Sequence, residues 1–193
     1  MKKLLKPFLL MALFAVPAII AAFGEEQASF PPYVDGEGRI SMPPDFKNQW
    51  AHVGSWVLTS QVAANPGESQ FSHGTGIHNV FTQPDSLKAY GKDGRWPDGT
   101  VLVLEVSPIQ WDDIPAGHVM YAGVATHWFV MVKDAKGRFK NNPSWESGWG
   151  WALFKAADPK KNVSASGKND CLSCHELAKD TDWIFKQGYP TLK

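Results

Sequence analysis

The sequence predicts an α+β domain that consists mainly of an antiparallel β-sheet with flanking helices. Strand-like runs follow one another along the chain, and short helical patterns stand toward its ends, an order typical of this class. The clearest run is Val101–Val106, in which apolar residues occupy almost every position. Period-two alternation places Leu102, Leu104 and Val106 on one face of this strand, and Val101, Val103 and Glu105 on the other.

The chain has 193 residues, and we expect three segments in it. Residues 1–23 resemble a secretory signal peptide, because lysines at positions 2, 3 and 6 precede an apolar run and small residues follow at 21–22. An uncleaved membrane anchor is the alternative. Residues 24–45 are rich in proline and glycine and predict an extended N-terminal arm. Residues 46–193 are long enough for a single domain with one core.

Further elements follow from local patterns along the domain. Residues 46–56 predict a short helix that turns into a strand, and Asp85–Tyr90 a short helix that Gly91 ends. Two strands, 119–124 and 127–133, are expected to be joined by a tight connection. A linker over 156–168 then leads to a C-terminal helix with Asn169 or Asp170 as its N-cap, which ends near Leu177 or Lys179. The other expected strands are 77–82 and 149–154.

The composition excludes one broad class of partner. The 19 basic and 19 acidic residues are interspersed, with no basic stripe that would bind nucleic acid. Nine tryptophans and eleven phenylalanines are many for this length. Such side chains can line a flat hydrophobic macrocycle, and they can equally form a well-packed β core.

The most specific pattern is Cys171-Leu172-Ser173-Cys174-His175, which contains both cysteines of the chain. C-x-x-C-H is the attachment signature of c-type haem, in which the thiols form thioethers and the imidazole becomes the proximal iron ligand. A thioredoxin-like pair would open a helix of a βαβ unit, and no such unit surrounds Cys171. A structural zinc requires four ligands, and a local disulfide would not require His175.

An ordinary electron-transfer cytochrome c is excluded by position. Only 18 residues follow His175, and none is the methionine that would serve as sixth ligand. A sixth ligand from the body of the domain stays open. The alternative is a five-coordinate iron, which binds small ligands or performs redox chemistry. The residues that could supply a sixth ligand are Met42, Met120, Met131, His78, His118 and His127.

With these features the chain resembles the cytochrome P-460 family, which includes the β-sheet cytochromes c′ (cytochrome c′-beta). The resemblance runs along nearly the whole mature chain and is most specific at its end. It rests on Trp50 with Val53-Gly54, on 81–90, on Trp96-Pro97-Asp98-Gly99-Thr100 with Val101–Val103, on 132–134, on 149–154, on 171–175, on 181–185 and on Tyr189-Pro190.

The resemblance implies a homodimer with one covalently attached haem c per chain and His175 as the proximal ligand of its iron. Cytochromes P-460 carry a lysine that is cross-linked to the porphyrin, and they oxidise hydroxylamine. The cytochromes c′-beta lack this link and bind nitric oxide at an apolar distal site. Here the matching position is Leu104, followed by Glu105, so that the cross-link cannot form at this position. Lys133 is the alternative nucleophile.

The resemblance also implies a distal pocket, for which His78 is the candidate polar group and Phe71 and Phe81 are candidate caps. The chain is therefore expected to be a periplasmic mono-haem cytochrome with five-coordinate iron that binds nitric oxide or a related small nitrogen ligand. Detoxification of this ligand is one role that such binding would serve. The alternative is an oxidoreductase acting on hydroxylamine or nitric oxide, with His78 or Glu105 as general base. A third hypothesis is an electron carrier with six-coordinate iron and a periplasmic redox partner.

Overall fold

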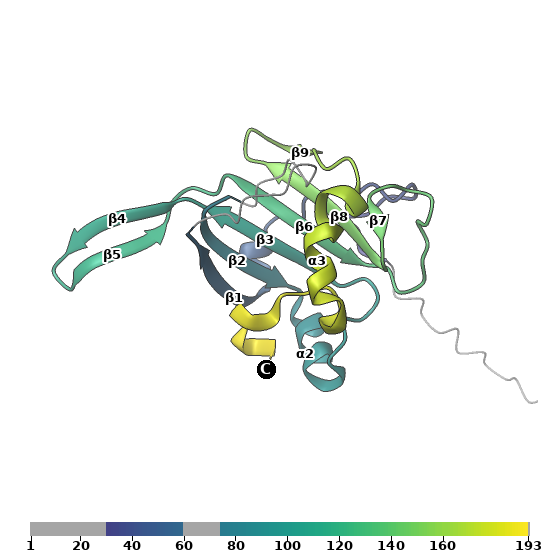
Figure 1. Cartoon of the computed structure of the whole chain (residues 1–193), viewed down its shortest axis with the longest axis horizontal. Coiled ribbons are helices and arrows are strands. Elements are labelled where there is room, and N and C mark those ends of the chain that lie inside the picture. Colours follow the sequence, from purple (N-terminus) through teal and green to yellow (C-terminus); the bar gives the residue numbers. More distant parts are fainter. Residues whose placement is uncertain (1–29, 60–73, 193) are drawn as a thin grey trace, which may run out of the picture.

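The computed structural model of the chain describes residues 30–59 and 74–192 (Figure 1). An antiparallel sheet of seven strands dominates these residues, in the order β1-β2-β3-β6-β8-β7, with β9 paired to β8. The expected α+β class is therefore confirmed. The strands are β1 (Ala51–Leu58), β2 (Gly76–Thr82), β3 (Val101–Ser107), β6 (His127–Lys133), β7 (Trp145–Glu146), β8 (Trp149–Lys155) and β9 (Asp158–Asn162).

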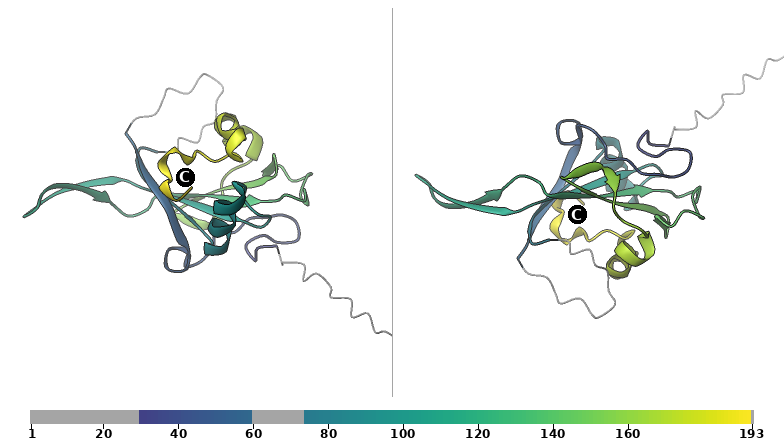
Figure 2. Two further views of the ribbon diagram at one scale, coloured as in Figure 1. Left: turned by 90° about the horizontal axis from the view of Figure 1, so that it is seen from below. Right: turned by 90° about the horizontal axis from the view of Figure 1, so that it is seen from above.

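Both faces of the sheet are buried. Alternation along β3 sends Leu102 and Leu104 to one face, where the C-terminal segment packs, and Val101 and Val103 to the other, where the N-terminal arm packs. Figure 2 shows the purple N-terminal segment and the yellow C-terminal segment on opposite sides of the sheet. We call these the C-terminal face and the arm face.

Two helices precede the central strands. Helix α1 (Phe46–Gln49) leads into β1, as expected from residues 46–56. Helix α2 (Pro84–Asp93) is longer than predicted, because it continues through Gly91 and ends at Gly94. Gly94 has φ +66°, the left-handed conformation that usually closes a helix and that glycine adopts without strain.

A separate hairpin projects from the sheet (Figure 1). It consists of β4 (Ile109–Ile114) and β5 (Gly117–Ala122), which among the described strands pair with each other alone. As predicted, a short connection joins β5 to β6, which begins at His127. Strand β4 was not predicted from the sequence, because it carries Asp112 and Asp113 and most of its residues are exposed, so no buried face imposes an apolar alternation.

The C-terminal region contains more regular structure than predicted. The presumed linker 156–168 contains β9, whose exposed lysines conceal its pairing with β8. The helical segment begins at Lys168, earlier than expected, because the Asp170 carboxylate accepts hydrogen bonds from the Ala165 and Ser166 backbone N–H groups ahead of the helix. Its parts are η1 (Lys168–Leu172), α3 (Ser173–His175) and η2 (Glu176–Thr181), followed by η3 (Lys186–Gly188) and η4 (Pro190–Leu192).

The N-terminal arm is described from Phe30 onward. Its chain folds back on itself through a bridge between Val34 and Ile40, and the Trp145 indole N–H donates to the Gly38 carbonyl oxygen at 2.8 Å. The predicted signal peptide, 1–23, lies outside the described residues. Within residues 30–59 and 74–192, none of the helices has the length and apolar character needed to cross a membrane.

Gly167 allows a close approach between the C-terminal segment and the sheet. A Cβ atom at this position would lie 2.4 Å from Trp151 Cδ1 and 3.0 Å from the Ser144 carbonyl oxygen. The backbone oxygen cannot move without disturbing β7, and Trp151 is buried. Glycine is therefore required for the segment that follows, which includes Cys171, to lie against β8.

We predict that Gly167→Ala lowers the free energy of unfolding by about 1–3 kcal/mol, the usual result of forcing an extra methyl group into a packed site. Gly91→Ala is the matched control, because a Cβ there meets no atom within 4 Å. In helix α2 it should raise stability by about 0.5–1 kcal/mol. Urea unfolding of both variants measures the difference. Equal stability of the two variants would contradict the close approach at Gly167.

Candidate haem site

The C-x-x-C-H motif lies on the helical segment that covers the C-terminal face. Cys171 is buried in one apolar cluster with Leu102, Met131 and Trp151, whereas Cys174 is exposed. Burial, with a smaller contribution from the Asp170 charge, raises the pKa of the Cys171 thiol to about 12. The two cysteines are three residues apart on helical backbone, the spacing that the C-x-x-C-H signature requires.

The imidazole of His175 is held on three sides. Its Nδ1–H donates to the Trp183 carbonyl oxygen at 2.6 Å, because a carbonyl oxygen can only accept. The ring stands edge-on to Trp151, with 4.9 Å between ring centroids, and lies 5.3 Å from Phe185. With the proton on Nδ1, Nε2 is the nitrogen whose lone pair is suited to a metal.

Leu104 lies on the same face of the sheet as the motif. It is half-buried and packs against the cluster that contains Cys171. Its partners across the sheet are Val80 on β2 and Phe129 on β6. The position that the family resemblance assigns to a cross-linking lysine is therefore on the C-terminal face, and it carries an apolar side chain.

His78 also belongs to the C-terminal face. It precedes Val80 by two residues on β2, and its ring stands edge-on to Trp56 at 5.2 Å. Nε2–H donates to the Gly74 carbonyl oxygen at 3.0 Å, which leaves Nδ1 as a buried acceptor without a hydrogen-bond partner among the described residues. Burial lowers the pKa of His78, and the bond to Gly74 opposes this effect only in part.

Glu105 and Phe81 are not brought to this face. Glu105 is next to Leu104 and so points to the arm face, where its Oε2 accepts from Trp128 Nε1 at 2.9 Å and pairs with the Lys47 amine. Phe81 packs on α1 through Phe46, with 5.3 Å between ring centroids. Strand alternation separates both side chains from Cys171 by the thickness of the sheet. Phe71 lies outside the described residues.

The residues that could supply a sixth ligand lie in different parts of the structure. Met131 lies in the cluster with Cys171, and His127 is on the same side of β6 by alternation. Met42 packs on the arm face. Met120 and His118 belong to the projecting hairpin, where His118 pairs with Asp113. The hairpin lies apart from the sheet, as Figure 1 shows, so it does not bring these two to the motif.

Lys133, the alternative nucleophile for a cross-link, has its amine engaged. Nζ lies 2.5 Å from Asp182 Oδ1 and 4.7 Å from the centre of the Trp149 ring. Asp182, Trp151 and Trp183 lie in stretches that carry the family resemblance, but they were not among the predicted site residues. The spacing of the C-x-x-C-H motif carries no information on them. Trp183 contributes to His175 through its backbone carbonyl, a group that every residue possesses.

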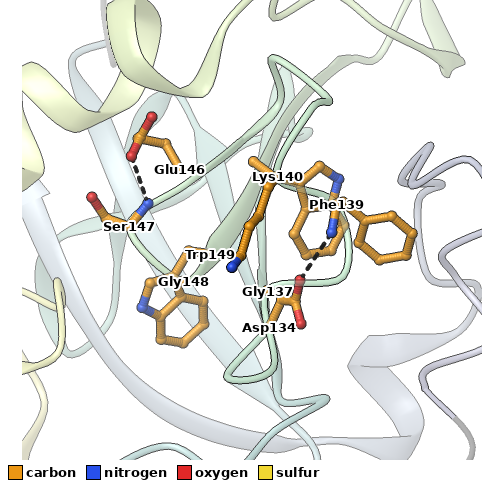
Figure 3. A pocket seen from close by; sticks show the side chains of 9 residues that line it. Asp134, Gly137, Phe139, Lys140, Glu146, Ser147, Gly148 and Trp149 are labelled. Carbon is orange, nitrogen blue, oxygen red and sulfur yellow. Dashed lines mark hydrogen bonds between the residues drawn. The ribbon is translucent and has the colours of Figure 1, made fainter.

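A pocket of about 280 Å³ lies where β6 ends and β8 begins (Figure 3). It contains none of the motif residues. The Asp134 carboxylate beside it is paired with Arg138. The residues that line the pocket are Asp134, Gly137, Phe139, Lys140, Trp145, Glu146, Ser147, Gly148 and Trp149.

The residues on the C-terminal face fit a c-type haem. Two thiols stand at the required spacing, the adjacent imidazole has its Nδ1 proton fixed by a carbonyl, and the surrounding side chains are apolar. The Nδ1 bond is the usual arrangement of a metal-binding histidine, since it fixes the tautomer and the ring orientation.

Comparison with known proteins agrees with this interpretation. The family model described as Cytochrome P460 matches residues 43–186, well over half of the chain. None of the curated proteins compared matches the chain. The family predicted from the sequence is confirmed.

We predict that His78 makes the protein less stable in mild acid. Below the ordinary histidine pKa of 6.5, the unfolded chain takes up a proton that the buried imidazole resists, so stability falls as the pH is lowered. His78→Gln retains an N–H donor for Gly74 but cannot titrate. The thermal midpoint of this variant should therefore change less between pH 7.5 and 5.5 than that of the wild type.

Val80→Ala is the control for this measurement, because it removes buried volume from the same face without removing a titrating group. It should lower the thermal midpoint at both pH values and keep the wild-type pH dependence. An unchanged pH dependence in His78→Gln would contradict the prediction.

Proposed function

Since the chain belongs to the cytochrome P460 family, it is a c-type cytochrome with covalently bound haem, and we propose that it binds nitric oxide or a related small nitrogen ligand at a five-coordinate iron. In this proposal Cys171 and Cys174 attach the porphyrin and His175 Nε2 is the proximal ligand. A haem iron with an open sixth position supplies reversible binding of small ligands and one-electron chemistry.

The apolar character of the C-terminal face carries this proposal. Leu104, Val80, Leu102 and Met131 all pack into the cluster that contains Cys171. Burying an anion among such side chains is costly, because they offer no hydrogen bonds or opposite charge, whereas a neutral diatomic loses little hydration there. Leu104 excludes water and supplies no nucleophilic nitrogen, which favours a ligand-binding protein of the cytochrome c′-beta kind.

A second function, oxidation of hydroxylamine, is favoured by one observation. His78 presents a buried Nδ1 acceptor on the face of Leu104, and burial, which lowers the pKa of this imidazole, keeps it neutral at neutral pH. A neutral imidazole can accept a proton from a bound substrate. Glu105, the other candidate base, points to the opposite face and is already paired with Lys47. His78 is therefore the base that this alternative requires.

The remaining proposals concern location and assembly. An exported, periplasmic protein follows from the charge and apolar pattern of residues 1–23. A homodimer is supported by the hairpin β4–β5, which exposes Trp111 by 69% and Met120 by 57% directly opposite each other. An isolated two-stranded hairpin is marginally stable, and a two-fold axis would bring this apolar patch against its own copy.

The decisive experiment is the absorption spectrum of the oxidised and reduced protein before and after nitric oxide is added. We expect the reduced Soret band of an ordinary high-spin c haem, and a shift of this band with nitric oxide. Leu104→Lys is the matched variant, because it supplies the lysine at the position of the family's cross-link. A strongly red-shifted reduced band in this variant alone would assign the difference to Leu104.

Two outcomes would overturn the proposal. A reduced band that does not respond to nitric oxide indicates a six-coordinate electron carrier, for which Met131 is the first variant to test. A red-shifted band in the wild type indicates a modified porphyrin. In that case, loss of the red shift in Lys133→Met would identify Lys133 as the amine that modifies the porphyrin. Steady turnover of hydroxylamine by the wild type that is lost in His78→Gln would establish that the protein oxidises hydroxylamine.

For the dimer, we predict that the double variant Trp111→Ser/Met120→Ser elutes as a monomer when light scattering measures its mass. Both side chains are largely exposed in one chain, so folding of the monomer should persist, as circular dichroism can verify. Val57→Ser removes an exposed apolar group from β1 and serves as control. A wild-type protein that is already monomeric would contradict the proposal.

A further inference from the structure

The turn at Asp182 and Trp183 has an unusual backbone. Asp182 has φ +56° and Trp183 φ +68°, so two consecutive residues other than glycine adopt the left-handed conformation. A side chain makes this region unfavourable, most of all for a bulky residue such as tryptophan. Such a turn persists only where surrounding interactions hold it, and turns of this kind gather at functional sites.

Two interactions hold the turn from outside its own segment. Lys133 Nζ lies 2.5 Å from Asp182 Oδ1, and the Trp96 backbone N–H donates to Asp182 Oδ2 at 3.3 Å. The Lys133 and Asp182 side chains are only 12% and 17% exposed, so solvent screens their attraction less than it would screen a surface pair. The end of β6 and the start of the turn before β3 are thereby fastened to the C-terminal segment.

This turn fixes the direction of the Trp183 carbonyl group. The Trp183 N–H donates to the Ala178 carbonyl oxygen at 2.8 Å, which fixes one side of the residue, and its own carbonyl oxygen accepts from His175 Nδ1 at 2.6 Å. The direction of that carbonyl depends on the dihedral angles of Asp182 and Trp183. A contact path therefore runs from Lys133 through Asp182 and the Trp183 carbonyl to the imidazole.

We propose that Lys133 and Asp182 are positioning residues for the proximal histidine: their ion pair holds the left-handed turn that aims the Trp183 carbonyl at His175 Nδ1. This inference rests on the proposed role of His175 as iron ligand. A carbonyl held in line with the Nδ1–H bond makes the imidazole more basic and the better donor to a metal. The same ion pair occupies the amine of Lys133, which is thus structural rather than a nucleophile.

The test uses the haem-loaded protein and the iron–histidine stretching band of its reduced form, measured by resonance Raman. Asp182→Asn removes the charge and keeps a residue type that tolerates the left-handed conformation. Lys133→Met removes the cation and keeps an unbranched chain over Trp149. We expect the band to move to lower frequency and broaden in both variants, and the haem reduction potential to rise. Lys133→Arg should keep the wild-type band.

Arg138→Met is the matched control. Arg138 also joins distant segments, through an ion pair with Asp98 whose two side chains are 26% and 27% exposed. Its loss should lower stability and leave the iron–histidine band in place. An unshifted band in folded Asp182→Asn, or an equal shift in Arg138→Met, would overturn the proposal.

A final variant separates this inference from the function on which it rests. In His175→Gly the iron–histidine band should vanish, and added imidazole should restore a band that no longer depends on Asp182. A band that persists in His175→Gly would refute the ligand assignment itself. A band that depends on His175 but is unaffected by Asp182→Asn or Lys133→Met would refute only the positioning role.

Discussion

Burial of the sheet on both faces constrains every other feature of the site. Because the N-terminal arm covers one side and the C-terminal segment the other, each residue of the central strands points to one of two covered faces, each of which holds an apolar cluster. Leu104 and Glu105 are neighbours in sequence, yet only Leu104 shares a cluster with Cys171. A shift of β3 by one residue would exchange them and place a carboxylate among the apolar side chains around Cys171.

Local pattern is sufficient to predict the central strands and insufficient for the edges. The run at β3 alternates between two apolar faces, so the amino-acid sequence alone assigns each of its residues to a face. Strands β4 and β9 carry mainly exposed residues, among them Asp112 and Asp113 in β4 and two lysines in β9, and such a pattern does not distinguish a strand from a loop. The pairing of β4 with β5 is a local hairpin in which Ile114 lies opposite Gly117, yet β4 was missed because its exposed residues show no apolar alternation.

The candidate site, too, has one part that the sequence predicts and another that it does not. The spacing of Cys171, Cys174 and His175 identifies the cofactor chemistry, and alternation places Leu104 on the correct side of the sheet. The residues that orient His175 are not predictable by these means. One acts through a backbone carbonyl, and the Lys133–Asp182 pair joins segments 49 residues apart. Long-range polar contacts of this kind have no period in the sequence.

The polar and apolar parts of the site act on different properties of a bound haem. In the proposed site, the hydrogen bond from His175 to the Trp183 carbonyl would govern how strongly the imidazole donates to iron. The apolar side chains around Leu104 govern which ligands can be buried beside it, because they disfavour charge whatever the strength of the proximal bond. In our proposal, Lys133 and Asp182 act on the first property from outside the apolar cluster. Ligand preference and the proximal bond would therefore change independently in this fold.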